Sequence, residues 1–470
     1  MFSLARSLSS RWHGKNGYRE ILNVGLPLAA GLFSTTLMMF TDRLFLSHYS
    51  VDAIAAAVPA ALANNSILFG FVGMVSYATV FIAQYIGSGA EERVGPALWQ
   101  GVWLALCCGI LMALLAFAAE PLFTFAGHDP HVQELEVLYF TILCLGSVMC
   151  LLTAALSCFF TGRGQTRPVL MADLVSAMVK IPCDYLLIFG VPGLIPSLGI
   201  AGAAISTVIA WTVSAVILAA LIFNEKFEKQ YKIFSGWRFH WPTFTRLLRF
   251  GAPSGLNLFM DIVAFFWFSL VVGGLGKVAL ASTNIAFSIN HIIFTPALGF
   301  NFAVASLAGR AMGAGKPLEA EELTKNSLHI AFFYMAPVAS LIALFSGPIM
   351  DLFAPGDISA AEFAPVRETG VFLLYYIACY SFVDAGNVIF FGALKGVGDT
   401  PGIFRLLLTG LVFFLVLPIS LINAFSLQSV HSYWIVLTVY IFFLAFAAMR
   451  RFYRRKWHTI RVVETAKPVE

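Results

Sequence analysis

Charged residues are scarce in this sequence. Only 11% of the 470 residues are Asp, Glu, Lys or Arg, whereas 59% are hydrophobic. A soluble globular domain carries about 25% charged residues, so the composition excludes that class and indicates a polytopic membrane protein. We therefore expect the lipid bilayer as a partner, and no nucleic acid.

Metal-binding and catalytic patterns are also missing. The nine histidines show no HxxxH or HExxH spacing, and the seven cysteines lie in apolar runs at no spacing typical of a metal site. We interpret the cysteines as small packing residues. We expect no cofactor and no bound metal. An integral-membrane enzyme is an alternative, but it would need clustered His or acidic groups at a membrane face.

Long apolar segments fill most of the chain. A helix needs about 20 apolar residues to cross a bilayer, and several segments are longer, which favours tilted or projecting helices. The first is too long for a cleavable signal peptide. We predict twelve spans, at 20–46, 53–86, 96–119, 132–161, 167–189, 198–223, 246–273, 278–309, 323–347, 366–394, 402–423 and 430–450. Internal prolines predict tolerated kinks, at Pro27, Pro59, Pro253, Pro296 and Pro418.

Basic residues alternate from loop to loop. The two tails and the loops after even-numbered segments hold nearly all of the loop Lys and Arg residues, and the other loops hold only Lys277 and Arg367. Such residues accumulate on the cytoplasmic side. We therefore predict a multi-pass protein of the cytoplasmic (inner) membrane with both termini in the cytoplasm. One missed span would invert half of the pattern, so the alternation supports the count of twelve.

The sequence contains an internal repeat. Three glycine-rich elements recur after 226 to 234 residues: Gly25-Leu-Pro27 and Gly251-Ala-Pro253, Gly87-Ser-Gly89 and Gly313-Ala-Gly315, and the stretches Gly162–Pro168 and Gly396–Pro401. Each half thus holds six segments in the same order and orientation. This arrangement is a parallel repeat about an axis along the membrane normal.

The predicted fold is an all-α integral membrane protein with twelve transmembrane helices. They form two six-helix bundles related by a pseudo-two-fold axis along the membrane normal. Such bundles suit alternating access, in which one lobe rocks against the other. The predicted parts are a cytoplasmic tail 1–19, an N-lobe 20–223, a basic linker 224–245, a C-lobe 246–450 and a basic tail 451–470.

The first span carries Asp42 beside Arg43 near its end. An ionisable group at membrane depth costs about 2.5–3.5 kcal/mol on insertion scales. Asp42 therefore indicates a cation or proton site that faces a polar cavity. The alternative is a snorkelling pair, in which Arg43 reaches the membrane interface and Asp42 follows it.

Three charged residues share the segment 167–189. Asp173, Lys180 and Asp184 are spaced to line one helical face, and Lys180 and Asp184 are i,i+4 neighbours that can pair directly. Pairing is expected because either charge alone would be expensive in the membrane. A functional site and a structural ion pair both remain possible for this pair. Asp173 lies close to the cytoplasmic end, which favours a structural role.

Asp261 and Asp384 lie in the middle of spans 7 and 10, with no basic residue nearby in the sequence. Each must be protonated, hydrogen-bonded, bound to a cation or paired with another helix. A buried carboxylate can titrate at physiological pH, which is a property that proton coupling requires. With hydroxyl and carbonyl neighbours it could equally hold Na⁺. The residues leave the choice between H⁺ and Na⁺ open.

The order of motifs resembles a known family. The stretches are TDRLFLSHYSVDAIAAA around Asp42, AQYIGSGAEER, FFTGRGQTRP, GIAGAAIST, LAGRAMGAGKPLEA and VDAGNVIFFGALKGVGDTP around Asp384. Their order, spacing and duplication over residues 15–450 resemble the multidrug and toxic compound extrusion (MATE) family, in its bacterial NorM/DinF-like branch. The resemblance implies a twelve-helix, two-lobed antiporter that exports organic cations and other drugs in exchange for H⁺ or Na⁺.

The resemblance also assigns candidate coupling residues. Asp42 matches the acidic position of span 1, and Asp184 matches a span-5 position that is Asp in one bacterial branch and Asn in another. Thr207 matches a polar position of span 6, and Asp261 and Asp384 match acidic positions of spans 7 and 10. A lipid-linked oligosaccharide flippase of the same superfamily is the alternative. It would have a more cationic central cavity than the mostly acidic interior found here. We expect a small, cationic, amphipathic substrate and a monomer.

Lys180 departs from the pattern, because the family usually has Asn at this position. A fixed ammonium there could take the place of bound Na⁺ in an N-lobe site with Asp42 and Asp184. We hypothesise that Lys180 neutralises an N-lobe carboxylate and that the pair opens or closes with protonation. This departure leaves the C-lobe, or H⁺, as the route of coupling.

Overall fold

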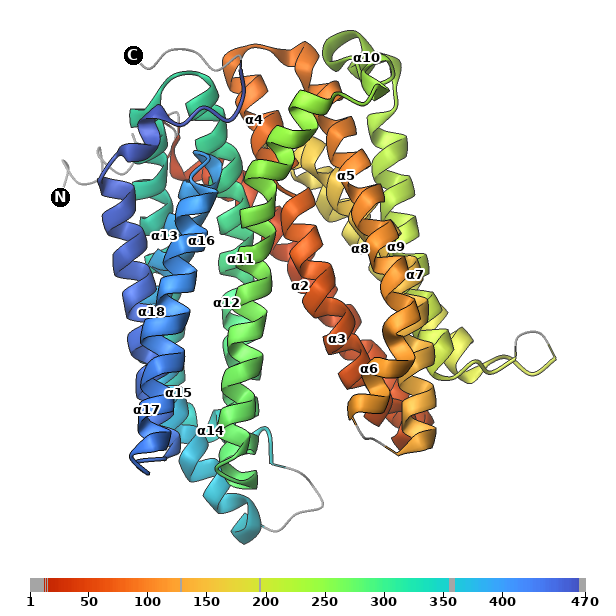
Figure 1. The fold of residues 1–470 in the computed structure, drawn as a ribbon, viewed down its shortest axis with the longest axis vertical. Coiled ribbons are helices and arrows are strands. Elements are labelled where there is room, and N and C mark those ends of the chain that lie inside the picture. Colours follow the sequence, from red (N-terminus) through yellow and green to blue (C-terminus); the bar gives the residue numbers. More distant parts are fainter. Residues whose placement is uncertain are drawn as a thin grey trace.

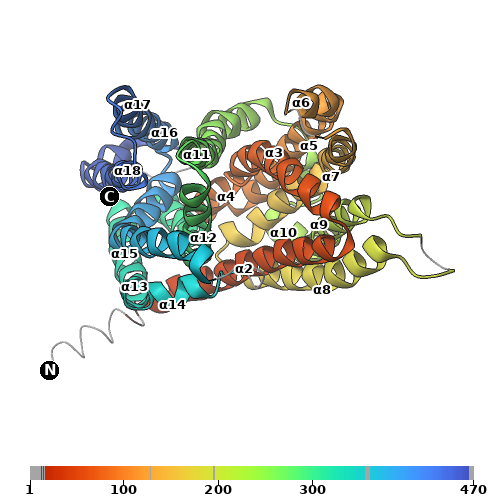
Figure 2. The same ribbon diagram turned by 90° about the horizontal axis from the view of Figure 1, so that it is seen from below.

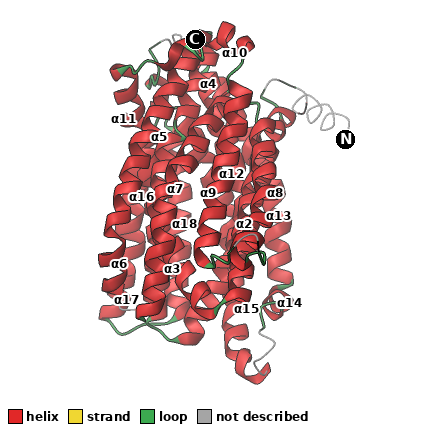
Figure 3. Cartoon of the chain, turned by 90° about the vertical axis from the view of Figure 1, so that its right-hand side faces the viewer, coloured by secondary structure: helices red, strands yellow, loops and turns green. Residues whose placement is uncertain are grey.

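The computed structural model describes residues 12, 14, 16–126, 129–193, 196–354 and 360–464, and nearly all of them are helical (Figure 3). The first half contains α2 (Tyr18–Tyr49), α3 (Val51–Val75), α4 (Ala78–Ser88), η1 (Glu91–Arg93), α5 (Val94–Leu115), η2 (Ala116–Ala118), α6 (Ala119–Ala126), α7 (Pro130–Gly162), α8 (Arg167–Phe189) and α9 (Ile200–Ile222). The linker forms α10 (Glu225–Tyr231) and η3 (Ser235–Trp237). The second half contains α11 (Trp241–Gly273), α12 (Lys277–Gly313), α13 (Pro317–Leu344), α14 (Ser346–Asp351), α15 (Ala360–Gly396), α16 (Thr400–Gly410), η4 (Leu411–Val416), α17 (Leu417–Ala424), α18 (Val430–Tyr453) and η5 (Lys456–Thr459).

Eleven helical stretches of the described chain are long and apolar enough to cross a membrane. The remaining predicted span, α8, is 23 residues long, as is α9, and it packs against both α2 and α9. Its charged residues, which include Asp173, Lys180 and Asp184, set it apart from the other spans. With α8 included, the all-helical fold with twelve spans is confirmed.

Several boundaries differ from the predicted segments. Span 2 is interrupted between α3 and α4, at Ser76 and Tyr77. The helix α11 begins at Trp241, earlier than the predicted residue 246, because the His240 side chain caps it and Pro242 fits the first turn. In span 11, a π-helical turn over Leu411–Val416 precedes Pro418. Such a turn accommodates the carbonyl that the proline leaves without a donor.

The helices form two lobes, each with its own hydrophobic core. One core is built mainly from α3 to α9, and the other mainly from α12 to α18. In Figure 1 the lobes meet at the end that carries α10, the start of α2 and the residues after α18, and they diverge toward the opposite end. We call the first of these the basic end. Seen along the lobes (Figure 2), α2 and α8 border one side of the N-lobe, while α12 lies at the junction with the C-lobe.

The internal repeat is visible in matching contacts. The Thr166 hydroxyl donates to the Val24 carbonyl at 2.9 Å, and the Thr400 hydroxyl donates to the Phe250 carbonyl at 2.8 Å. Each of these interactions fixes the start of a helix (α8 or α16) against the first helix of its own half. The predicted parallel repeat therefore has a counterpart in side-chain geometry.

Each half lends the beginning of its first helix to the other half. Ile21 and Val24 of α2 are buried in the core of the second half. Phe244 and Leu247 of α11 are buried in the core of the first half. Ile21 and Leu247 occupy equivalent places in the repeat, 226 residues apart. The two lobes thus interlock at the basic end.

The linker is held against α5 by hydrogen bonds to its backbone. The Trp99 indole donates to the Ile233 carbonyl at 2.6 Å, and the Trp103 indole donates to the Trp237 carbonyl at 3.1 Å. Because these bonds hold the backbone itself, the linker is an ordered part of the N-lobe.

Arg163 holds the helix α10 of the linker in place. Its guanidinium lies 4.7 Å from the ring centre of Phe159, 4.6 Å from that of Phe227 and 4.9 Å from that of Tyr231. Phe159 belongs to α7 and the other two rings belong to α10. The cation therefore joins the last turn of α7 to the linker through its attraction to three aromatic faces.

Candidate functional site

The N-lobe contains a buried ion cluster of Asp42, Lys180 and Asp184. The Lys180 ammonium donates to both carboxylate oxygens of Asp184, at 3.0 and 2.9 Å, and also forms an ion pair with Asp42. The side chains of Lys180, Asp184 and Asp42 are 3%, 0% and 13% exposed. Asp42 comes from α2 and the other two residues come from α8. The spacing predicted the pairing within α8, the family resemblance placed Asp42 in the same N-lobe site, and in the structure the three side chains form one cluster.

A serine completes this cluster. The Ser206 hydroxyl of α9 lies within hydrogen-bond reach of both the Asp184 carboxylate and the Ala203 carbonyl. The neighbouring Thr207, the candidate from the sequence, donates to the Ala203 carbonyl at 3.0 Å and forms no hydrogen bond with the described residues of the cluster. Ser206 was missed because two adjacent hydroxyls on an apolar helix carry no sequence signal that tells which one faces α8.

The charges in the N-lobe cluster do not balance. With both carboxylates ionised, one ammonium faces two negative charges, so the three groups together carry one net negative charge. Uptake of a single proton makes the cluster neutral. Because an uncompensated charge is costly in a low-dielectric interior, proton uptake or an added cation changes the electrostatics of this lobe strongly. Arg43 is exposed and forms no ion pair with Asp42 among the described residues.

Asp173 lies apart from the cluster, two helical turns nearer the start of α8. Its carboxylate packs directly over Gly31 of α2, where an added Cβ would overlap a carboxylate oxygen. The absence of a side chain at Gly31 thus lets α2 and α8 approach closely.

The C-lobe brings Asp261 of α11 and Asp384 of α15 into electrostatic reach of each other. Asn387 donates to the Asp384 carboxylate at 3.2 Å. The Tyr440 hydroxyl of α18 lies near both acidic groups. In the part of the chain that the structure describes, neither carboxylate forms an ion pair with a Lys, Arg or His side chain. The two lobes therefore differ, because the N-lobe carboxylates share an ammonium and the C-lobe carboxylates do not.

Sequence reasoning missed two further polar residues of α7. Glu136 is fully buried, and Tyr139, one turn further on, is 5% exposed and lies within electrostatic reach of Asp42 and Asp184. Glu136 could have been found by the rule that drew attention to Asp42, since it is an acid within a predicted span. Tyr139 offers no such signal. Across the described residues, no group of three or more His, Cys, Asp or Glu side chains could hold a metal ion.

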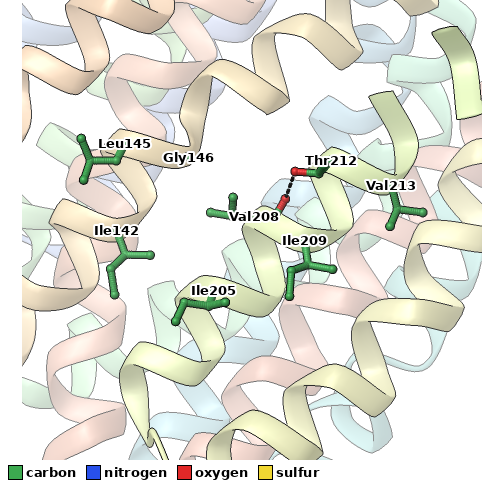
Figure 4. Close-up of a pocket in the computed structure, with 8 residues that line it drawn as sticks. All are labelled: Ile142, Leu145, Gly146, Ile205, Val208, Ile209, Thr212 and Val213. Carbon is green, nitrogen blue, oxygen red and sulfur yellow. Dashed lines mark hydrogen bonds between the residues drawn. The ribbon is translucent and has the colours of Figure 1, made fainter. Parts of the chain in front are cut away.

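A separate apolar cavity of about 470 Å³ lies between α7 and α9 (Figure 4). Its lining includes Ile142, Leu145 and Val208, and the hydroxyl of its one threonine, Thr212, is bonded to the Val208 carbonyl at 2.8 Å. The cavity offers no charged group. It therefore lacks the chemistry needed to bind an ion or a cationic molecule.

Comparison with known proteins identifies the family. The family model MatE matches residues 27–186 and 253–421, which together make up more than half of the chain and one stretch in each half of the repeat. The chain belongs to the MatE family. The two matched stretches begin at equivalent places in the two halves, at Pro27 and Pro253. The predicted family resemblance is thus confirmed.

MatE relatives match over most of their length. The chain is 25% identical over 445 residues to the probable multidrug resistance protein NorM of Mannheimia succiniciproducens, covering 93% of each chain. It is 29% identical over 395 residues to the multidrug resistance protein PmpM of Pseudomonas aeruginosa, covering 81% of this chain and 79% of the relative. These relatives are named as resistance proteins, so the prediction of a transporter rather than an enzyme is confirmed.

Solved MatE structures share the fold. An outward-facing multidrug resistance MATE transporter superimposes with a TM-score of 0.85 at 19% identity, covering 95% of this chain and 98% of that chain. A transporter of the MOP superfamily from Pyrococcus furiosus, described as having a binding pocket of reverse polarity, superimposes with a TM-score of 0.83 at 19% identity, covering 95% and 97%. At this identity the likeness supports the two-lobed fold alone.

Proposed function

We propose that the protein is a secondary antiporter of the cytoplasmic membrane that exports small, cationic, amphipathic molecules in exchange for H⁺ or Na⁺. The observation that carries this proposal is that Asp261 and Asp384 of the C-lobe form no ion pair with a basic side chain among the described residues. Two acidic groups within electrostatic reach of each other in a membrane protein favour binding of a proton or another cation. Membership of the MatE family, whose relatives are named as multidrug resistance proteins, supports the same function.

The proposed orientation places the basic end in the cytoplasm. The Lys and Arg residues of the linker, and those of the tails that the structure describes, lie at this end, as expected from the rule of cytoplasmic positive charge. The lobes diverge toward the opposite end (Figure 1), so with this orientation we propose that the arrangement is outward-facing. Because both lobes and both acidic clusters belong to one chain, we propose that a monomer carries out transport.

Coupling requires that each ligand prefers one orientation of the lobes. Entry of H⁺ or Na⁺ from outside into the C-lobe neutralises Asp261 or Asp384. A bound organic cation would satisfy the same charge. The two ligands therefore compete for the same negative charge. The ion is released inside and the organic cation outside, and the gradient of the ion drives the exchange.

In the N-lobe, Lys180 takes the place of a bound metal cation. Its ammonium contacts both Asp42 and Asp184 and balances one of their two negative charges. Uptake of one proton would neutralise the other. We therefore assign Na⁺ binding, if Na⁺ is the coupling ion, to the C-lobe. Thr207 remains a candidate coupling residue from the family resemblance, although its hydroxyl is bonded within α9.

The first test is efflux of ethidium from proteoliposomes, with an imposed pH gradient and an imposed Na⁺ gradient applied separately. Asp42→Asn and Asp384→Asn are measured alongside the wild type. Efflux that is driven by one gradient and lost in Asp384→Asn supports the proposal and identifies the ion. If neither gradient drives efflux, export of organic cations is wrong, and a lipid-linked oligosaccharide becomes the substrate to test.

The second test concerns Lys180. Lys180→Met removes the ammonium, and Lys180→Asn restores the residue usual in the family. We expect both variants to change the pH dependence of efflux, because the cluster then carries two negative charges with no internal cation. Unchanged efflux and an unchanged pH profile in both variants would overturn the role of Lys180.

A further inference from the structure

The chain continues beyond α18 and is first fixed to the C-lobe. Trp457 is fully buried in the C-lobe core, stacks on Phe452 at 5.1 Å between ring centres and donates to the Phe452 carbonyl at 2.8 Å. Arg455 forms an ion pair with the buried Glu321 of α13 at 2.7 Å, and the ring of His458 lies 3.1 Å from the same carboxylate. The turn η5 is therefore a firm part of the C-lobe.

The next residues cross to the N-lobe. Val462 and Val463 are 0% and 1% exposed and belong to the hydrophobic core of the N-lobe. On its way the chain passes over Gly398, in the turn between α15 and α16, where the Val462 side chain occupies the space that a Cβ would need. Ile460 packs against both cores. We call residues 460–464 the strap.

The end of the strap is held by polar contacts with three elements. The Tyr85 hydroxyl of α4 donates to the Glu464 carboxylate, with both oxygens at 3.3 Å. Arg246 of α11 pairs with the same carboxylate, and Arg93 of η1 lies 3.5 Å from it. Tyr85 is 1% exposed. Glu464 therefore joins the C-terminal part of the chain to the N-lobe and to the first turns of α11.

We infer that the strap is a gate element that holds the basic end closed, with Val462, Val463 and Glu464 as its contact residues. This inference rests on the proposed alternating access. If the lobes separate at the basic end, residues 460–464 cannot remain attached to both, because η5 is fixed to one lobe and the valines are buried in the other. Opening toward the cytoplasm then exposes two buried apolar side chains and breaks the contacts of Glu464. The strap thus favours the outward-facing state.

Other contacts also close the basic end, and the strap adds to them. Arg310 of α12 pairs with Glu20 of α2, and the Ser306 hydroxyl donates to the Thr161 carbonyl at 2.6 Å. These groups belong to the spans themselves. The strap differs because its contact residues can be altered without touching a span or either acidic cluster.

The test measures the separation of the lobes directly, without a substrate. Spin labels are placed on the exposed positions Lys229 of α10 and Lys325 of α13, in protein with its native cysteines replaced, and distances are measured by pulsed electron paramagnetic resonance in nanodiscs. We expect Glu464→Gln and the double variant Val462→Ser/Val463→Ser to raise the long-distance population at least threefold. The matched control is Arg461→Gln, an exposed residue of the same strap, and we expect it to leave the distribution unchanged.

A charge exchange tests the specific contact. Arg246→Glu alone should open the basic end, and Arg246→Glu combined with Glu464→Arg should shift the distribution back toward the wild type, although Arg93 then faces a second cation. The restored pair also guards against a valine variant that fails to fold. If Glu464→Gln and Arg246→Glu both give the wild-type distribution, the strap does not control the gate. If the wild-type protein shows no gradient-driven efflux but the variants change the distance distribution as expected, the proposed function is refuted and the role of the strap still holds.

Discussion

Gly87 of α4 and Gly313 of α12 face each other's helices where these cross at the basic end. A Cβ at Gly87 would overlap the Arg310 carbonyl, and a Cβ at Gly313 would overlap the Gln84 carbonyl. Gln84 and Arg310 are themselves 226 residues apart, as the two glycines are. The crossing is therefore symmetric, and the repeat axis passes between these helices. Two copies of one glycine motif thus serve a single contact between the lobes.

This contact predicts the effect of a small substitution. Gly87→Ala places a methyl group against backbone that cannot turn away, so the helices must separate. We expect a loss of about 1–3 kcal/mol in the free energy of unfolding, measured by thermal unfolding in detergent. Gly273→Ala at the end of α11 is the control, since its Cβ meets only the Leu280 side chain, at 3.7 Å. Equal melting temperatures for the two variants would contradict the close crossing.

The hydroxyl groups of α9 give a second prediction. Ser206→Ala removes a hydrogen bond to the Asp184 carboxylate, and such bonds to charged groups contribute about 1.5–3 kcal/mol. We expect efflux under a fixed gradient to fall roughly tenfold and its pH dependence to shift. Thr207→Ala removes only a bond within α9 and should change efflux by less than about twofold. The reverse order of effects would restore Thr207 as the coupling residue.

The Arg163 site gives a third prediction. Arg163→Gln removes the cation that three aromatic rings surround, at a cost of about 1–2 kcal/mol. Because this cation holds α10, we expect trypsin to cleave the linker several times faster, at Lys226, Lys229 or Lys232, with the spans still folded. Arg167→Gln, on the exposed first turn of α8, should leave cleavage unchanged. Equal cleavage of both variants would show that the other contacts of the linker, such as the Trp99 and Trp103 bonds, hold it without Arg163.

The strap should respond to acid. Burial raises the pKa of Glu464, but its backbone hydrogen bond and the nearby Arg246 and Arg93 outweigh burial and lower the pKa below its usual range. Because the pKa of Glu464 is lowered in the closed state, the ionised carboxylate stabilises closure. This stabilisation is fully present above the ordinary Glu pKa of about 4.3. It is lost as the pH falls through the lowered pKa. We expect the open population of the labelled protein to rise only below about pH 4. Glu464→Gln should abolish this rise, and a rise that persists would assign it to another group.

The features that could be predicted from the sequence are those that depend on residues close together in the chain. Lys180 and Asp184 are one turn apart, so their pairing could be read from the chain, and the span pattern and the repeat followed from hydropathy and glycine positions. Spacing alone could not add Asp42, because it lies 138 residues from Lys180 and its approach depends on how α2 and α8 are rotated; the family resemblance placed it in the same N-lobe site. The choice between Ser206 and Thr207 failed for a related reason, since adjacent helical residues point about 100° apart.

The strap was beyond sequence reasoning for a different reason. The predicted basic tail 451–470 has many Lys and Arg residues, which indicate a solvated segment. Two adjacent valines are too short an apolar signal to predict burial. The burial of the two valines depends on the Gly398 turn and the N-lobe core lying side by side, which only the three-dimensional structure shows.

The exchange of Ile21 and Leu247 between the lobes has a consequence for the origin of the fold. Each half covers an apolar turn that the other half provides, so neither half is a complete folding unit. A six-helix ancestor would have left this turn uncovered unless two identical copies paired side by side in the same orientation. The interlocked contact of the present chain is the one that a parallel homodimer of such halves would form. Gene fusion would make that pairing permanent and free the two halves to diverge, with Lys180 in one half and, among the described residues, no ion pair at Asp261 or Asp384 in the other.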